Sequence, residues 1–179
     1  MLTSSNGRTM RFLESDVRSM GRGAAGVRGI RMEAEDNLVS LIVVEDGHIL
    51  TATEKGYGKR TEADDYPRKK RGGKGVIDIK TTDRNGPVVG AVQVLDDDEV
   101  MLITSGGTLI RTAVDGISVV GRNTQGVRLI RIDDDERLVE IERVATAGDA
   151  SSDEGDEPSD DESSPASGDA DDSTAAPDE

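Results

Sequence analysis

The first 144 residues repeat one pattern three times, with a period of about fifty residues. A Gly-x-x-x-Arg element recurs once in each copy, beginning at Gly7, Gly56 and Gly107. A Gly-Val pair recurs with the same spacings of 49 and 51 residues, at 26–27, 75–76 and 126–127. Such self-similarity is typical of architectures in which each repeat buries its apolar surface against its neighbours. The sequence therefore predicts three copies of one structural unit, at residues 1–44, 47–94 and 99–144.

The third copy illustrates the strands that each copy is expected to contain. Residues Val100–Thr104 and Thr108–Thr112 flank a Ser-Gly-Gly turn, which is typical of a β-hairpin. A third strand is expected at Val127–Ile132 and a fourth at Arg137–Val144. Four short strands in each copy predict an all-β, propeller-like array of four-stranded blades. Because one blade cannot bury both of its faces, the three blades are expected to stack as part of a larger ring.

Acidic residues are concentrated at the end of the chain. Residues 145–179 contain 13 of the 37 Asp and Glu residues and none of the 22 Lys and Arg residues. The remaining 24 acids and 22 bases give residues 1–144 a net charge of only −2, which permits a basic face. The terminal segment has no aliphatic residue larger than Ala, so it cannot bury enough apolar area to offset its ordering entropy. We therefore expect a disordered acidic tail.

The composition excludes several classes of function. The chain has no Cys and one His, His48, so thiolate sites, Cys nucleophiles and multi-histidine metal sites are not expected. No catalytic constellation is present. No apolar run approaches the roughly 18 residues that a membrane helix needs, and the N-terminus has no export signal. We expect a cytoplasmic, non-catalytic protein without a metal or a cofactor of its own.

Cationic side chains recur at matched places in the three copies. The first offset holds Arg11, Arg60 and Arg111; the second holds Arg22, Arg71 and Arg122; the third holds Arg31, Lys80 and Arg131. Blades arranged around an axis would place these side chains in three rows along a curved edge. Such rows suit a curved polyanion, and a DNA duplex presents phosphates in that way. No feature of the sequence indicates base readout, and binding through the backbone and a bend needs none.

The densest basic segment spans residues 68–75, Arg-Lys-Lys-Arg-Gly-Gly-Lys-Gly. Its five cations are Arg68, Lys69, Lys70, Arg71 and Lys74. The glycines let the main chain approach a phosphate closely and offer it N–H donors. We predict that these residues contribute to DNA binding.

The sequence resembles the C-terminal domain of the bacterial DNA gyrase A subunit, over essentially all of residues 1–144. The resemblance is carried by Gly-Tyr-Gly-Lys-Arg-Thr at 56–61, Met-Leu-Ile-Thr-Ser-Gly-Gly-Thr-Leu-Ile-Arg-Thr at 101–112, and Val-Gly-Arg-Asn-Thr-Gln-Gly-Val at 120–127. The resemblance implies a six-bladed β-pinwheel, of which this chain would hold the last three blades and the acidic tail. Residues 69–75 are similar to the family's Gln-Arg-Arg-Gly-Gly-Lys/Arg-Gly box, with Lys69 in the place of Gln.

The same resemblance implies a mechanism and partners. The basic perimeter of the pinwheel bends and wraps double-stranded DNA, so that the holoenzyme introduces negative supercoils at the expense of ATP. The partners would be the rest of the gyrase A subunit, together with the gyrase B subunit, in an A2B2 complex. ATP and Mg²⁺ would bind elsewhere in that complex, and the DNA-cleaving Tyr would lie in an upstream domain.

Two alternatives share the predicted architecture. The first is the equivalent domain of topoisomerase IV, against which the 120–127 motif and the box-like loop favour gyrase. A propeller-type protein-interaction platform would use the acids as its working surface and would bind no nucleic acid. The acidic tail likewise has two interpretations: a solubilising appendage, or a tethered polyanion that competes with DNA for the basic rows.

Overall fold

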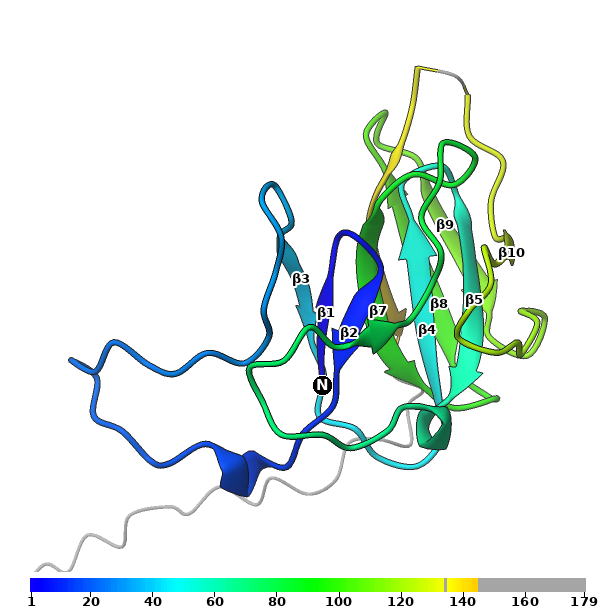
Figure 1. The fold of residues 1–179 in the computed structure, drawn as a ribbon. Helices are drawn as coiled ribbons and strands as arrows, with labels where there is room; N and C mark the ends of the chain where they lie inside the picture. Colours follow the sequence, from blue (N-terminus) through cyan, green and yellow to red (C-terminus); the bar gives the residue numbers. More distant parts are fainter. Residues whose placement is uncertain (134, 145–179) are drawn as a thin grey trace, which may run out of the picture. The chain divides into compact units, whose positions relative to one another are not determined.

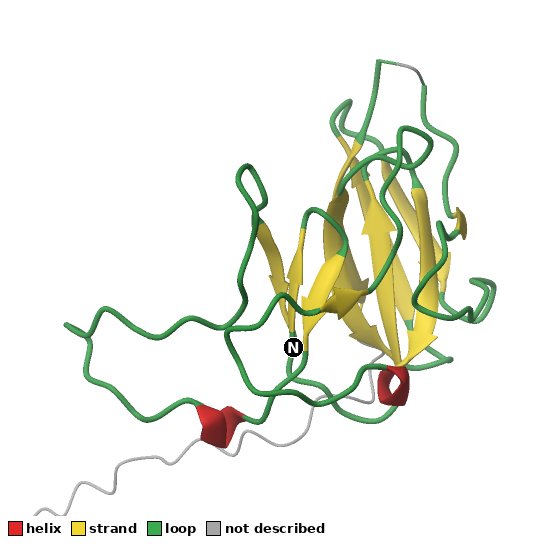
Figure 2. Cartoon of the chain, in the orientation of Figure 1, coloured by secondary structure: helices red, strands yellow, loops and turns green. Residues whose placement is uncertain are grey.

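The computed structural model describes residues 1–133 and 135–144, and the predicted acidic tail, residues 145–179, lies outside the described residues. The described part is all-β apart from two single-turn 3-10 helices, η1 (Glu14–Asp16) and η2 (Ala63–Asp65) (Figure 2). Its strands are β1 (Leu2–Ser4), β2 (Arg8–Met10), β3 (Leu38–Leu41), β4 (His48–Thr53), β5 (Tyr57–Glu62), β6 (Val76–Ile77), β7 (Val88–Val94), β8 (Glu99–Thr104), β9 (Leu109–Ala113), β10 (Val127–Arg128) and β11 (Leu138–Val144). The all-β prediction is confirmed.

The strands form three antiparallel sheets, which we call the first, second and third sheets. The strand order is β3-β1-β2-β6 in the first, β10-β5-β4-β7 in the second, and β11-β8-β9 in the third. Each sheet is centred on a hairpin, β1–β2, β4–β5 or β8–β9, as the turn signals in the sequence predict (Figure 1). The strands β3, β7 and β11 flank these hairpins, and β7 contacts both β3 and β11.

Each four-stranded sheet takes one strand from the next copy, which corrects the expectation that a copy supplies all of its own strands. Strand β6 lies in the second copy but pairs with β2 in the first sheet. Strand β10 lies in the third copy but pairs with β5 in the second sheet. Both exchanged strands have only two residues, so the predicted strand Val127–Ile132 is also too long. Strand period alone cannot distinguish these pairings, because an exchanged strand and a local one have the same pattern.

The exchanged strands meet their hosts through glycines with positive φ. Gly75 precedes β6 with φ +72°, and a Cβ there would lie 2.4 Å from the carbonyl oxygen of Thr9. Gly126 precedes β10 with φ +75°, and a Cβ there would lie 2.6 Å from the carbonyl oxygen of Gly58. Only glycine combines this backbone conformation with so close an approach. The repeated Gly-Val pair therefore marks the start of each exchanged strand.

The apolar core lies mainly between the second and third sheets. Its buried members include Leu50, Val94, Leu102, Val114 and Ile141. Smaller clusters lie elsewhere, around Ile49 with Tyr66 and around Leu2 with Met10. Along β8 the burial alternates, with Val100, Leu102 and Thr104 inside, as expected for a strand with one covered face.

A buried polar cluster occupies the interface between the first and second sheets. Lys59 of β5 lies 3.3 Å from Asp78, which follows β6, and neither side chain is exposed. The hydroxyls of Thr51 and Tyr66 donate to the Asp78 carboxylate at 2.8 and 2.6 Å. Burial lowers the pKa of Lys59 below 10.5, and the charge and hydrogen bond of Asp78 oppose that shift. The cluster ties the exchanged strand to the sheet of its own copy.

Candidate nucleic-acid interface

The first offset of the repeated cations serves the interfaces between sheets. Arg11 donates from Nη1 to the carbonyl oxygens of Ala63 and Tyr66, at 2.5 and 3.3 Å. Arg60 donates from Nε to the carbonyl oxygen of Ile117 at 2.7 Å, and Ile117 is the third-copy equivalent of Tyr66. Arg11 is half-buried and Arg60 is buried. The structure therefore places these two guanidinium groups at the interfaces between sheets and not in the predicted surface row.

Arg111, the third member of that offset, behaves differently. Its side chain is 56% exposed and forms an ion pair with Glu99 across the β8–β9 hairpin. The described residues supply no following copy whose carbonyl oxygens it could reach. The same repeat position thus holds an interface arginine in the first two copies and a surface arginine in the third.

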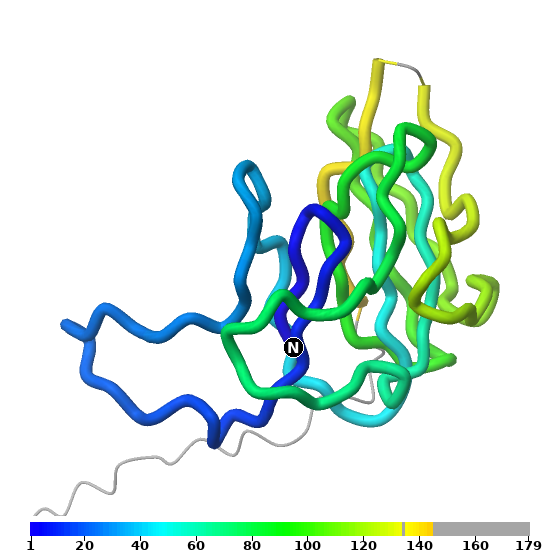
Figure 3. The backbone as a smooth tube through the Cα atoms, in the orientation of Figure 1, coloured from blue at the N-terminus to red at the C-terminus, as the bar shows by residue number. Residues whose placement is uncertain are grey.

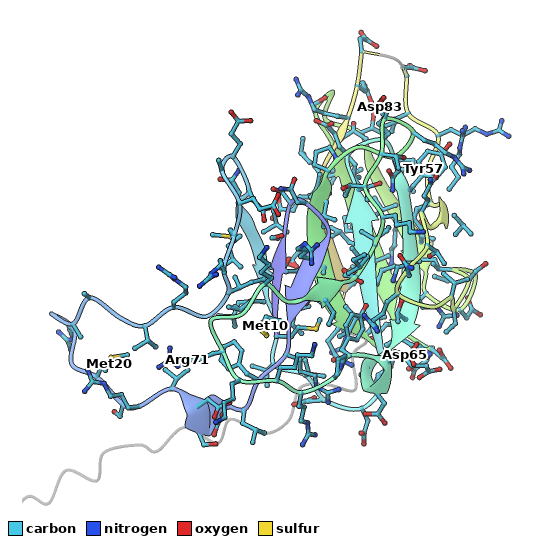
Figure 4. All side chains as sticks on the ribbon, viewed as in Figure 1. Met10, Met20, Tyr57, Asp65, Arg71 and Asp83 are labelled. Atoms are coloured by element: carbon cyan, nitrogen blue, oxygen red, sulfur yellow. The ribbon has the colours of Figure 1, made fainter. Side chains whose placement is uncertain are left out.

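The second offset also joins successive copies. Arg71 donates from Nη1 to the carbonyl oxygen of Arg28 at 3.1 Å, and from Nε to that of Asp16 at 3.0 Å. Arg122 repeats the first contact, donating to the carbonyl oxygen of Ile77 at 2.9 Å. Figure 4 labels Arg71 beside the long loop that follows β2. Both guanidinium groups remain partly exposed, whereas Arg22 of the first copy is fully on the surface.

The third offset is the one whose three members all lie on the surface. Arg31, Lys80 and Arg131 are exposed, and within residues 1–133 and 135–144 their side chains form no ion pair. Their positions are fixed by the main chain: the Arg31 N–H donates to the Gly73 carbonyl oxygen at 2.8 Å. The Lys80 N–H makes the equivalent bond to Thr124 at 2.7 Å. This row is available to a polyanion.

The basic box-like loop lies against the long loop of the first copy. The Lys69 N–H donates to the Arg11 carbonyl oxygen at 2.9 Å, and the Gly72 N–H donates to the Gly29 carbonyl oxygen at 2.5 Å. In Figure 3 the two loops meet near the two ends of the long loop, and the rest of the long loop projects away from the sheets. Residues 17–31 and 66–77, which we call the basic loop pair, contain nine cations and no acid. The exposed cations of the basic loop pair are Arg18, Arg22, Arg28, Arg31, Arg68, Lys69, Lys70 and Lys74.

The structure adds cations that the repeat pattern missed. Arg18 and Arg28 belong to the basic loop pair, and Arg128 lies on β10. None of them recurs as a cation in all three copies, so a search for triplicated positions does not find them. A search for acid-free stretches would have found them, because residues 116–132 also lack Asp and Glu.

A second concentration of cations surrounds Tyr57 at the start of β5 (Figure 4). The guanidinium carbons of Arg84 and Arg128 lie 4.9 and 5.2 Å from the centre of its ring. Arg128 also donates to the Tyr57 hydroxyl at 2.8 Å. The hydrogen bonds from Arg128 and then Arg84 lower the pKa of Tyr57 below 10.0. Stacking on one ring holds both cations in fixed positions.

A family model described as the DNA gyrase C-terminal domain, beta-propeller, matches residues 1–45, 47–94 and 98–145. The chain belongs to the DNA gyrase C-terminal domain family. The resemblance stated from the sequence is therefore confirmed. Within this family the chain is similar over 146 residues to the DNA gyrase A subunits of Salmonella typhimurium and Escherichia coli, at 60% identity in both cases. Each alignment covers 81% of this chain and 17% of the relative, so the chain spans about a sixth of those proteins.

Solved structures support the same fold. A DNA gyrase A C-terminal domain superimposes with a TM-score of 0.75 and 30% identity, covering 80% of this chain and 50% of that one. A topoisomerase IV C-terminal domain gives 0.74 and 27%, covering 80% and 45%. The backbone thus hardly separates the two families, and the sequence does, because the 60% identical relatives are gyrase subunits. The gyrase assignment holds against the topoisomerase IV alternative.

Two further observations concern the described part of this gyrase-family chain. No group of three or more His, Asp or Glu side chains is arranged there to hold a metal ion. No helix in it is long and apolar enough to cross a membrane.

Proposed function

We propose that this chain binds and bends double-stranded DNA as the wrapping module of a DNA gyrase A subunit. The observation that carries the proposal is the basic loop pair, in which two segments from different copies combine nine cations with no acid. Duplex DNA binds to such a surface chiefly through its phosphates, with release of counterions. The exposed third-offset row, Arg31, Lys80 and Arg131, extends the basic surface from copy to copy.

The interactions that support this function are made with the DNA backbone. The loop at 68–75 offers four exposed cations and three glycines, whose main chain a phosphate can approach closely. Binding of this kind fixes the path of the duplex without reading its sequence. A duplex that follows cations on successive copies must curve, and its deformation is offset by the additional phosphate contacts.

The chain would act within a larger enzyme and would not itself catalyse a reaction. The proposed partners are double-stranded DNA, the rest of the gyrase A subunit, and the gyrase B subunit, in an A2B2 complex in the bacterial cytoplasm. The complex would use the wrap to introduce negative supercoils, with ATP and Mg²⁺ bound on other domains. This part of the proposal rests on the family, whose curated members here are gyrase A subunits.

The decisive experiment is duplex binding by fluorescence anisotropy across a salt series, with the 179-residue chain. Lys69→Gln, Lys70→Gln and Lys74→Gln together should weaken binding and reduce the slope of log affinity against log salt by about 0.9 for each phosphate that is no longer neutralised. Arg137→Gln is the matched control, because Arg137 is an exposed cation already paired with Glu54. An affinity that is unchanged by the triple substitution, or insensitive to salt, would contradict the proposal. Salt-insensitive binding to a basic protein, with no affinity for DNA, would instead favour the protein-interaction platform.

A further inference from the structure

Two arginines meet on one tyrosine ring where the second and third copies join. Arg128 of β10 lies directly opposite Tyr57 in the pairing of β10 with β5, so the two side chains share one face of the second sheet. Arg84 reaches the same ring from the turn before β7. Both strands and the turn have their partners within the described chain. The pairing of the exchanged strand therefore brings the two cations together.

A buried asparagine fixes the turn that carries Arg84. Asn85 is fully buried, and its Nδ2 donates to the carbonyl oxygens of Lys80 and Gln125 at 2.9 and 3.2 Å. Gln125 leads into β10, so this one side chain ties the turn with Arg84 to the exchanged strand with Arg128. The two guanidinium groups are therefore positioned without any ligand, which lowers the entropic cost of binding one.

These two positive charges are held close together without an acidic partner. Both guanidinium carbons lie within 5.2 Å of the centre of the Tyr57 ring. In the described part of the chain neither arginine forms an ion pair; their polar contacts are with the Tyr57 hydroxyl and, for Arg84, with the Gln125 side chain at 3.5 Å. A guanidinium has five N–H donors, more than these contacts use. The ring offsets part of the repulsion between the cations, and an anion that bridges them would offset more.

The charges around the pair indicate what kind of anion it can take. A hollow of about 500 Å³ beside Tyr57 is lined by cations and acids in equal numbers. Of its other cations, Arg137 is paired with Glu54 at 3.5 Å and Lys55 donates to a main-chain carbonyl oxygen. The acids at 133–136 would repel a small anion that filled the hollow. The arrangement therefore favours a single phosphate that a larger molecule presents at the arginine side of the hollow.

The cluster occurs at one junction and is not part of the repeated pattern. With the repeat spacing, Arg8 and Thr108 take the place of the tyrosine ring in the first and third copies. The turn with Arg84 is basic only in the second copy, because the corresponding turns read Glu-Ala-Glu-Asp at 33–36 and Asp-Asp-Asp-Glu at 133–136. A search for cations shared by the three copies therefore does not find this site.

We propose that Arg84 and Arg128 together bind one backbone phosphate of duplex DNA, and that Tyr57 is the positioning residue that holds both guanidinium groups for it. The site deepens the proposed function and rests on it. Arginine suits this role because its planar fork of donors matches the phosphate oxygens. Figure 4 labels Tyr57 far from Arg71 and the long loop, so this phosphate contact lies well apart from the basic loop pair.

Duplex binding by the 179-residue chain across a salt series tests the two arginines. Arg84→Gln combined with Arg128→Gln should weaken binding about tenfold and reduce the slope of log affinity against log salt by about 0.9, the value for a single phosphate. Arg137→Gln is the matched control, because Arg137 lines the same hollow but is already paired with Glu54. An unchanged affinity, or a slope reduced by twice that amount, would overturn the shared phosphate.

Substitutions at Tyr57 test its positioning role, because they change no charge at neutral pH. Tyr57→Leu removes the ring and should reproduce most of the loss seen with the arginine double variant. Tyr57→Phe keeps the ring for stacking and should retain more of the affinity. Added to the arginine double variant, Tyr57→Leu should have no further effect on DNA binding. A further loss of similar size would show that Tyr57 acts independently of the arginines and would overturn its role.

A spectroscopic measurement on the unaltered chain does not depend on how the substitutions are tolerated. The chain has two tyrosines, and Tyr66 is buried with its hydroxyl bonded to Asp78, so it serves as an internal reference. During titration with a short duplex, the ring NMR signals of Tyr57 should shift while those of Tyr66 stay in place. A Tyr57 signal that does not move at saturation would overturn the site. An equal shift with inorganic phosphate alone would overturn DNA as its ligand.

Comparison with the basic loop pair distinguishes failure of this site from failure of the proposed function. If the Lys69, Lys70 and Lys74 triple variant binds duplex more weakly while the Arg84 and Arg128 double variant binds as the wild type does, the wrapping surface stands and the phosphate site fails. If the wild-type chain has no salt-dependent affinity for duplex DNA, both fail.

Discussion

Lys59 and Asp78 form an ion pair that is wholly buried between the first and second sheets, at a position where the other two copies are apolar. With the repeat spacing, Lys59 corresponds to Met10 and Ile110, and Asp78 corresponds to Gly29 and Leu129. Ile110 and Leu129 are partly buried and pack against the main core cluster. Equivalent positions thus hold a buried ion pair at the interface of the first and second sheets and apolar side chains at the interface of the second and third sheets.

Removing one partner of this ion pair should destabilise the fold strongly, whereas replacing both partners with apolar residues should not. Asp78→Leu leaves the Lys59 ammonium buried without a counter-charge and should lower the free energy of unfolding by about 3–5 kcal/mol. The triple variant Lys59→Ile, Tyr66→Phe, Asp78→Leu places the third-copy residues at 59 and 78 and removes the Tyr66 hydroxyl, so it should recover most of that loss. Urea unfolding followed by circular dichroism measures both. A triple variant no more stable than the single one would show that the polar cluster is needed for the fold itself.

The two tyrosines should ionise very differently. Arg128 and Arg84 lower the pKa of Tyr57, while burial first and the Asp78 carboxylate second raise the pKa of Tyr66 well above 10. In an absorbance titration the folded chain should therefore show one phenolate, with its midpoint below pH 10. Arg128→Gln should move that midpoint upward. Two equal phenolate steps in the folded chain would contradict the buried position of Tyr66.

The same burial links Tyr66 to alkaline stability. Its folded pKa is above its unfolded value of 10.0, so the unfolded chain releases the proton first as the pH rises. The contribution of Tyr66 to stability is complete below pH 10 and is lost as the pH rises above it. Tyr66→Phe should lower stability at pH 7 by about 1 kcal/mol and make the decline above pH 10 shallower. Parallel declines for the two proteins would show that Tyr66 does not titrate on unfolding.

Members of one repeat offset should differ in their effect on stability. Arg60 donates to the carbonyl oxygens of Ile117 and Asp115 and to the Asp96 carboxylate, so Arg60→Ala should cost about 2–4 kcal/mol. Arg111→Ala removes an exposed ion pair and should cost less than about 1 kcal/mol. Thermal unfolding of the two variants compares them directly. Equal losses would mean that Arg111 also has an interior role.

The third-offset cations should act on DNA and not on folding. Arg31→Gln, Lys80→Gln and Arg131→Gln are exposed changes, so the melting temperature should stay nearly constant while duplex affinity and its salt dependence fall. Each single substitution should weaken binding by a similar factor, irrespective of DNA sequence. A loss confined to one sequence would indicate base readout and would contradict backbone binding.

The acidic tail, residues 145–179, should compete with DNA. Its 13 carboxylates are tethered to the basic surface at high effective concentration. A chain ending at Thr146 should therefore bind duplex more tightly, most clearly at low salt. An equal affinity at low salt would leave the tail as a solubilising appendage.

The hairpins, the repeat and the glycine turns could be predicted from the sequence, because they depend on residues close together in the chain. The exchange of β6 and β10 could not, since Val76 pairs with Thr9 across 67 residues and a local partner would satisfy the same pattern. The interior roles of Arg11 and Arg60 could not be predicted for a related reason. Recurrence shows that Arg11 and Arg60 occupy equivalent places, but only the surrounding carbonyl oxygens show that those places are interior.

The repeat in the sequence and the sheet in the structure differ by one strand, because each four-stranded sheet takes its exchanged strand from the next copy. Deleting one complete copy would therefore leave no hairpin unpaired at the deletion, because the exchanged strand of the next copy would replace the deleted one. Without the second copy, Val127–Arg128 would pair with β2 as Val76–Ile77 does now. An insertion would be absorbed in the same way. A gene encoding such an array can gain or lose whole repeats through unequal recombination. In each product, a sheet that is followed by another copy still receives its exchanged strand from that copy.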